Sequence, residues 1–384
     1  MPGLVSLMKL ISRTIDVIDN STNLEDLHTV ANVSILMSCT TTGESTDVKS
    51  DLIWQIGKDS GVIQLKNLIP LDILYSIPHS GTTGGIWLQH HREFSNFLSK
   101  FNPASVLEIG GAHGILATDY MKNNNAIPWT IIEPNPFPID DCPAVFINDF
   151  FDQSFSPTEK IDTIVHSHVF EHVYEPNEFM RNIANLMSNG DKLIFTLPNM
   201  EHMLENKYTN CINFEHTIFL SEPYIEYLLS KFGFRVIEKT YFSNHSIFYS
   251  TVRDDTVAPF KLDPNLYEQN KQLYLDYVKY YEDLIIELNN KSKDTTLPIY
   301  LFGAHVFSQY LLTVGLDSTK IISVLDNDTK KQGKRLYGTR LKIQSPQVLK
   351  NGQAMVVILK AGFYNEEIKQ DILENINPNI IFWE

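Results

Sequence analysis

The chain has 384 residues, of which 43% are hydrophobic and 20% charged, the composition of a globular protein with two or three domains. Its formal net charge is −15 and it contains no run of Lys or Arg, so the basic surface that holds nucleic acid is not expected. Its three cysteines are isolated in the sequence, which excludes a disulfide framework and a zinc site made of paired cysteines.

The first residues combine apolar side chains with Lys9, Arg13 and Asp16, a pattern that predicts the start of an amphipathic helix and not a signal peptide. No stretch approaches the ~18 apolar residues that cross a bilayer, so we expect a cytoplasmic protein without a membrane partner. Residues 1–92 then hold short apolar stretches, a polar Ser/Thr-rich stretch and a strand signal at 61–65. We interpret them as an N-terminal α+β lobe.

Residues 93–258 alternate short β-rich runs with helical stretches. The runs lie at residues 105–109, 129–133, 144–147, 161–165, 192–197 and 246–250. Strands separated by helices predict a mostly parallel, doubly wound sheet of the α/β class. Because such connections are right-handed, the carboxyl ends of the strands share one edge, and a ligand is expected there at the switch point.

The last third of the chain predicts a second α/β unit. Apolar residues recur at helical spacing from 262 to 291, which predicts a linking helix within 259–296 that ends in a polar linker at 289–296. Residues 297–384 then begin the α/β pattern again, with strands at 298–302, 321–325 and 355–359. We predict a smaller Rossmann-like domain there, and the sequence is compatible with a homodimer.

The first strand of the larger sheet runs directly into a glycine-rich turn that opens a helix. Gly110, Gly111 and Gly114 remove Cβ atoms where the backbone must approach a ligand. A nicotinamide enzyme uses the pattern G-x-G-x-x-G, but Ala112 stands at its second glycine here. Glu108, at the mouth of the strand, would repel a pyrophosphate. It suits the amino group and sulfonium of S-adenosylmethionine (SAM).

Side chains after the next three strands fit the same cofactor. Glu133 follows the second strand and can bind both ribose hydroxyls. Asn148, Asp149 and Phe150 follow the third strand and offer a polar contact to the adenine amine and an apolar face to its ring. His168 follows the fourth strand, beside the expected position of the methyl group.

With these motifs the sequence resembles the class I methyltransferases. Its whole layout is similar to that of the sugar C-methyltransferases that act on nucleotide-linked keto-sugars, which have a small N-terminal domain, a SAM domain and a C-terminal Rossmann-like domain. The likeness is carried by residues 75–80, 87–91, 168–172, 214–219 and 303–333. Two features depart from the family. Its N-terminal domain usually binds zinc through paired cysteines, which are missing here, and His168 stands in place of Asn.

The resemblance implies roles for particular side chains. Tyr75 and Ser80 belong to the segment that covers SAM. Glu215 and His216 match the catalytic segment, where His216, aided by Glu215, would be the base, because a histidine ordinarily titrates near neutral pH. His168 is a further catalytic and cofactor-binding candidate. The histidines expected to contact the substrate are His91, His172 and His245.

The expected reaction is transfer of a methyl group from SAM to a carbon of a nucleotide-linked keto-sugar through a base-generated enolate. The first alternative is O-methylation of a sugar hydroxyl in glycan or natural-product synthesis. An alternative of another class is a non-catalytic nucleotide-binding protein, or an NAD-dependent enzyme that uses the C-terminal domain. His168, Glu171 and His172 also form a grouping of two histidines and a carboxylate that can bind metal, but we expect no metal.

Overall fold

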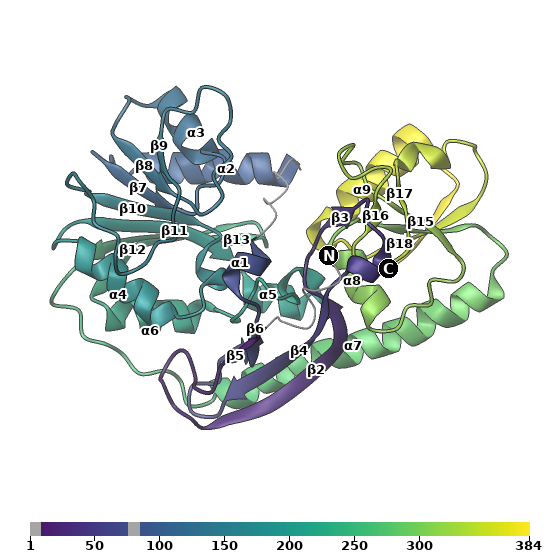
Figure 1. Cartoon of the computed structure of the whole chain (residues 1–384), viewed down its shortest axis with the longest axis horizontal. Coiled ribbons are helices and arrows are strands. Elements are labelled where there is room, and N and C mark those ends of the chain that lie inside the picture. Colours follow the sequence, from purple (N-terminus) through teal and green to yellow (C-terminus); the bar gives the residue numbers. More distant parts are fainter. Residues whose placement is uncertain (1–8, 76–84) are drawn as a thin grey trace.

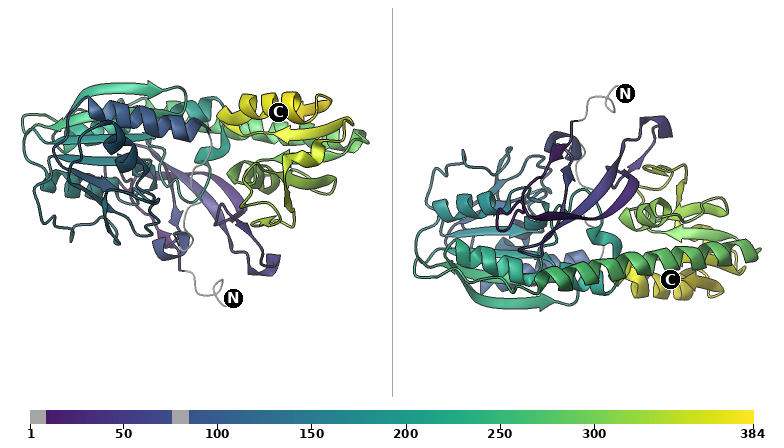
Figure 2. Two further views of the ribbon diagram at one scale, coloured as in Figure 1. Left: turned by 90° about the horizontal axis from the view of Figure 1, so that it is seen from above. Right: turned by 90° about the horizontal axis from the view of Figure 1, so that it is seen from below.

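The computed structural model describes residues 9–75 and 85–384, and in it two α/β bodies lie side by side over one long helix (Figure 1). This helix, α7 (Leu266–Asp294), extends under both bodies, and the N-terminal hairpin lies along it (Figure 2). Within the described residues, no helix has the length and apolar character needed to cross a membrane.

The first body contains a seven-stranded sheet with the order β12-β13-β11-β10-β7-β8-β9. Its strands are β7 (Val106–Ile109), β8 (Trp129–Ile132), β9 (Val145–Ile147), β10 (Thr163–Ser167), β11 (Lys192–Pro198), β12 (Phe234–Phe242) and β13 (Ser246–Arg253). Strand β13 is antiparallel to both of its neighbours, and all other pairs are parallel. The predicted doubly wound, Rossmann-like sheet is confirmed, with its switch point between β7 and β10.

Helices cover both faces of this sheet because the side chains of each strand alternate between them. On β7, Leu107 and Ile109 pack on the side of α4 (Pro176–Leu186) and α6 (Glu222–Lys231). Val106 packs on the opposite side, with α2 (Gly85–Ser99) and α3 (Ile115–Asn123). Shorter helical elements of this body are α1 (Leu71–Leu74), η2 (Phe170–His172), α5 (Met200–Glu205) and η3 (Thr209–Cys211).

The second body has a five-stranded, fully parallel sheet with the order β17-β15-β14-β18-β19. Its strands are β14 (Ile299–Phe302), β15 (Ile321–Leu325), β17 (Ile343–Gln344), β18 (Met355–Leu359) and β19 (Ile380–Trp383). Its helical elements are α8 (Val306–Thr313), η4 (Pro346–Leu349), η5 (Gly362–Tyr364), α9 (Asn365–Asp371) and the π-turn η6 (Ile372–Ile376). A second parallel α/β unit was predicted for this part of the chain.

The predicted polar linker at 289–296 is wrong for most of its length, because α7 continues to Asp294. Ser292 is buried against the second body. Lys320 donates from Nζ to the carbonyls of Ser292 (2.7 Å) and Lys293 (3.0 Å), and a lysine in this position stabilises the end of a helix. Tertiary contacts thus extend a helix that the local sequence did not predict.

The N-terminal lobe is mainly β-structure. A long antiparallel hairpin is formed by β2 (Leu24–Ser34) and β4 (Lys49–Gly57), with β5 (Ile63–Leu65) as a third strand. The remaining elements are β1 (Ile11–Ser12) paired with β6 (Asn67–Leu68), β3 (Cys39–Thr40) paired with β16 (Arg335–Leu336) of the second body, and η1 (Glu44–Thr46).

The predicted amphipathic helix at the start of the chain is wrong for the residues that the structure describes. There the chain forms β1 and a series of turns. Arg13 is buried, and its guanidinium donates to the carbonyls of Thr217 (3.0 Å) and Tyr174 (2.6 Å). Asp16 accepts from the backbone of Ile18 at 2.8 Å, a local turn that competes with a helix.

The lobe connects to both bodies by specific contacts. Next to the first body, β5 exchanges backbone hydrogen bonds with the segment 217–219, from Leu65 N to Thr217 O and from Phe219 N to Ile63 O, both 2.9 Å. Next to the second body, Arg335 forms a bidentate ion pair with Asp47 at 2.6 and 2.7 Å. The lobe therefore fixes the loop that follows Glu215 and His216.

Candidate active site

The glycine turn after β7 has a backbone that favours glycine. Gly110 has φ +75°, and Gly114, the N-cap of α3, has φ +68°. A Cβ on Gly110 would lie 2.5 Å from Cγ2 of Val169, and one on Gly111 would lie 2.8 Å from Cδ of Glu108. The turn is therefore in close contact with the residue after His168, at the switch point of the sheet.

Gly110→Ala is expected to lower the melting temperature and to weaken SAM binding. The added methyl strains a positive φ, which costs about 1–2 kcal/mol, and it also collides with Val169. Gly190→Ala is a matched control, because Gly190 has φ +94° but no atom within 4 Å of an added Cβ. Thermal unfolding of both variants separates the two costs. Equal losses would show that contact with Val169 contributes nothing.

Glu133 lies at the carboxyl end of β8 and is half-buried beside the turn. Its Oε2 accepts from the backbone N of Ala112 at 3.3 Å, and its Oε1 accepts from the N of Asn135 at 2.9 Å. These two bonds orient the carboxylate at the edge where the cofactor is expected. The bidentate contact with the ribose stays a prediction.

Glu108 lies deeper than the sequence suggested, with 3% of its surface exposed. Its Oε2 accepts from the indole Nε1 of Trp129 at 2.8 Å. Burial raises the pKa of Glu108 to about 7, and the neighbouring charge of Glu133 raises it further. Glu108 thus packs beneath Gly111 of the glycine turn. Its direct contact with SAM stays a prediction.

The buried Glu108 predicts a pH dependence of stability. Its pKa is about 7 in the folded chain against 4.5 ordinarily, so its contribution is fully present below pH 4.5 and is lost as the pH rises through 7. The shift corresponds to about 3 kcal/mol. The free energy of unfolding in urea should differ less between pH 5 and pH 8 for Glu108→Gln than for the original chain, because glutamine does not titrate. All other titrating groups are the same in both chains, so their effects cancel in this comparison. An unchanged difference would contradict the shift.

The residues expected to bind adenine lie on the surface after β9. Asn148, Asp149 and Phe150 are exposed, and Asp149 accepts from the backbone N of Phe150 at 2.8 Å. This leaves their side chains accessible from solvent at the edge of the sheet. Their contact with the adenine ring stays a prediction.

Tyr75 connects the N-terminal lobe to this edge. Its carbonyl accepts from Nδ2 of Asn135 at 2.5 Å, next to Glu133. Burial raises the pKa of its hydroxyl well above the ordinary value, and the charges of Glu215, Glu171 and Glu133 raise it further. Tyr75 therefore lies between the predicted ribose site and the catalytic segment. Ser80 lies outside the described residues.

Three imidazoles, His90, His168 and His245, converge beside the turn, and we call them the histidine triangle. Their ring centroids are 5.1 to 5.6 Å apart. The hydroxyl of Ser246 bridges two of them, at 2.9 Å from Nε2 of His168 and 2.5 Å from Nδ1 of His245. His168 has φ +52°, an uncommon conformation that turns its side chain into this group.

A second group, which we call the Glu171 cluster, consists of Glu171, His172 and His216. One donor atom from each residue lies within 4.8 Å of the others, and the two imidazole rings are 4.9 Å apart. Nδ1 of His168 lies 3.3 Å from Oε1 of Glu171 and joins the cluster to the triangle. Both groups lie where β10 ends, beside the glycine turn.

The catalytic segment is held by a local turn. Oδ1 of Asn213 accepts from the backbone N of Glu215 (2.8 Å) and of His216 (2.9 Å). Burial lowers the pKa of His216 to about 3, and the charges of His168 and His305 lower it further. His216 is therefore a neutral imidazole near pH 7 that can bind a cation. By itself it is a weaker base than the sequence led us to expect, because that expectation assumed an ordinary histidine pKa. His305 belongs to the glycine turn of the second body, so that turn lies near His216.

Most predicted histidines come together here. His168, His172, His216 and His245 belong to the two groups, whereas His91 belongs to neither. Its ring nevertheless lies beside the triangle, with its centroid 5.7 Å from that of His90, and burial lowers its pKa.

Sequence reasoning gave no role to Ser246, whose hydroxyl contacts His168 and His245. It placed Trp87 and His90 only within the covering segment 87–91, and it considered Glu171 as a metal ligand together with His168 and His172 but not with His216. Trp87 contacts the triangle edge-on, with centroids 4.8 Å from both His168 and His245.

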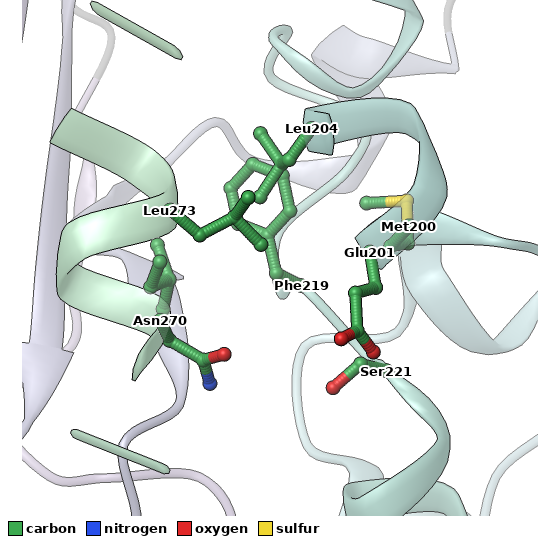
Figure 3. Close-up of a pocket in the computed structure, with 8 residues that line it drawn as sticks. Met200, Glu201, Leu204, Phe219, Ser221, Asn270 and Leu273 are labelled. Atoms are coloured by element: carbon green, nitrogen blue, oxygen red, sulfur yellow. The ribbon is translucent and has the colours of Figure 1, made fainter. Parts of the chain in front are cut away.

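A small cavity lies between α5 and α7, away from these groups (Figure 3). Leu204, Phe219 and Leu273 line one part of it, and the polar groups of Glu201 and Asn270 line another. Its volume of about 10 Å³ accommodates one water molecule at most. It is therefore too small for an acceptor molecule.

Residues 87–239, which include the glycine turn and the Glu171 cluster, match a protein family described as "Methyltransferase domain". No curated protein matches the sequence of the chain. Similar solved structures include the 1,6-didemethyltoxoflavin-N1-methyltransferase of Burkholderia thailandensis with bound S-adenosylhomocysteine, at 12% identity over 44% of this chain and 82% of that chain (TM-score 0.36). An O-methyltransferase family protein from the same organism is similar at 12% identity over 44% and 56% (TM-score 0.36). The N-methyltransferase NodS of Bradyrhizobium japonicum is similar at 13% identity over 45% and 99% (TM-score 0.33).

Proposed function

We propose that this chain, a SAM-dependent methyltransferase whose class I domain includes residues 87–239, methylates a carbon of a nucleotide-linked keto-sugar. One observation supports this most: the segment that carries Glu215 and His216 lies between the two bodies, since Ile212 and Phe214 share a hydrophobic core with Ala304 and Tyr310 of the second body. The charge of Glu215 raises the pKa of Tyr75 at the cofactor edge, and the charge of His305 in the second body lowers the pKa of His216. An acceptor that extends from the cofactor to the second glycine turn suits this position.

In the proposed reaction the glycine turn and Glu133 hold SAM with its methyl group toward His168. The Glu215–His216 pair removes a proton from the carbon next to the keto group. The resulting enolate carbon attacks the methyl group, the S–CH3 bond breaks, and S-adenosylhomocysteine leaves. Positioning of the two reactants supplies much of the rate in such transfers. The nucleotide part would lie toward the second glycine turn, where α8 begins.

Incubation of a keto-sugar nucleotide with the enzyme in D2O tests the carbon route. We expect deuterium at the carbon next to the carbonyl, and slower exchange with Glu215→Gln. Methylated product without exchange at that carbon would favour O-methylation instead. Neither exchange nor product with any sugar nucleotide, from a chain that binds SAM, would contradict this acceptor class.

A further inference from the structure

The carboxyl group of Glu171 is fully buried, and its ion-pair partners among the described residues are two imidazoles. Its side chain is 0% exposed, and within the described residues neither oxygen has a hydrogen-bond partner. The two ion-pair distances are 3.3 Å to Nδ1 of His168 and 3.7 Å to Nε2 of His172. An ionised carboxylate is costly in such a place unless a cation accompanies it. No Lys or Arg of the described chain forms an ion pair with it.

We propose that the Glu171 cluster binds a divalent transition metal, contrary to the expectation of no metal from the sequence. The ligands are a carboxylate oxygen of Glu171 and one imidazole nitrogen each from His172 and His216, which already lie within 4.8 Å of one another. Nδ1 of His216 is buried and has no hydrogen-bond partner among the described residues. Ligand atoms at about 2.1 Å from one ion are roughly 3–3.5 Å apart, so small side-chain rotations close the site.

The donor set selects the kind of cation. Two imidazoles and one carboxylate suit Zn²⁺, Fe²⁺, Co²⁺ or Ni²⁺, whereas Mg²⁺ and Ca²⁺ prefer oxygen ligands throughout. His168 supports the site from outside, since its Nδ1 lies next to Glu171 and its Nε2 contacts Ser246. Such outer partners orient metal ligands in proteins.

The histidine triangle is the competing site, and the structure favours the Glu171 cluster over it. In the triangle the Ser246 hydroxyl already contacts Nε2 of His168 and Nδ1 of His245. The triangle also has no negative charge of its own that a cation would balance.

The inference rests on the proposed methyl transfer, in which His216 would act as a ligand of the cation. A cation with three protein ligands keeps positions for two oxygens of an acceptor, such as a keto oxygen and a neighbouring hydroxyl. The cation polarises the bound oxygen, and Glu215 accepts the proton that the acceptor loses and later releases it to water. The acceptor class is therefore narrowed to molecules with two adjacent oxygens.

The test uses the full chain, freed of metal with EDTA and titrated with Co²⁺, whose visible absorption reports nitrogen ligation. We expect one Co²⁺ per chain, competed away by Zn²⁺. Glu171→Gln and His216→Ala should each weaken binding at least about tenfold, the range seen even for outer-shell residues. His90→Ala, in the triangle, should bind Co²⁺ as the original chain does. Calorimetry with SAM verifies that each variant is folded.

Failure of the metal site and failure of the proposed function are distinguishable. No Co²⁺ spectrum from the original chain, unchanged binding in His216→Ala, or loss of binding only in His90→Ala would overturn the metal site. Methyl transfer that is undiminished in EDTA would do the same and would leave the proposed function intact. Stoichiometric Co²⁺ binding without transfer to any keto-sugar nucleotide would support the site and contradict the proposed acceptor.

Discussion

Glu133→Gln is expected to weaken the binding of SAM or S-adenosylhomocysteine about 10- to 100-fold. A carboxylate can accept hydrogen bonds from both ribose hydroxyls, whereas the amide presents only one oxygen. Hydrogen bonds to charged groups contribute about 1.5–3 kcal/mol, and each 1.4 kcal/mol is a factor of ten in affinity. Calorimetric titration measures the change.

The control for this variant is Asp140→Asn, which removes the same charge from the exposed loop after β8. The affinity of the Asp140→Asn variant for SAM should equal that of the original chain. Glu133 also accepts two backbone hydrogen bonds, so the melting temperature is measured alongside. Unchanged affinity in a folded Glu133→Gln variant would remove Glu133 from the cofactor site.

His216→Ala is expected to lower the rate of methyl transfer about 10²- to 10⁴-fold, because it removes a group on which deprotonation of the acceptor depends, either as part of the Glu215–His216 pair or as a ligand of the proposed cation. SAM affinity should be unaffected, because the side-chain group to which His216 belongs contains neither Glu133 nor a residue of the glycine turn. Single-turnover rates with saturating SAM separate these two effects.

His202→Ala serves as the comparison for this variant. His202 lies on α5 and contacts Glu205 and Asn206 there, outside both histidine groups. The His202→Ala variant should transfer methyl groups at the rate of the original chain. A fully active His216→Ala variant would show that the catalytic segment acts through other side chains.

Local sequence patterns predicted the parts of the fold that depend on local chemistry. The buried strands of a parallel sheet are short apolar runs, and β15 and β18 begin and end at the predicted residues. The edge strand β12 was not predicted, because its outer side is exposed and polar residues interrupt the apolar pattern. Strand β1 was missed because it depends on pairing with β6, more than fifty residues away.

In the site, too, features set by local sequence could be predicted, whereas features that depend on contacts between distant residues could not. The glycine turn and Glu133 lie within one stretch of sequence, and each follows a strand that could be recognised. The depth of Glu108 depends on Trp129, which comes from the neighbouring strand. The Glu171 cluster brings together residues from two loops, and its second imidazole, His216, could not be placed beside Glu171 from sequence spacing.

The backbone pairing of β5 with residues 217–219 limits how far the protein can be shortened. The apolar core that holds this segment is shared: it contains Trp54 of the hairpin, Phe219, and Tyr274 of α7. A fragment restricted to the family match would retain the glycine turn and Glu133 but would lose β13, the strand that joins β11 to β12 in the sheet. It would lose the partners that shape the loop of Glu215 and His216. We therefore expect that shortening the chain to the family match disrupts both the sheet of the first body and the loop of the predicted catalytic pair.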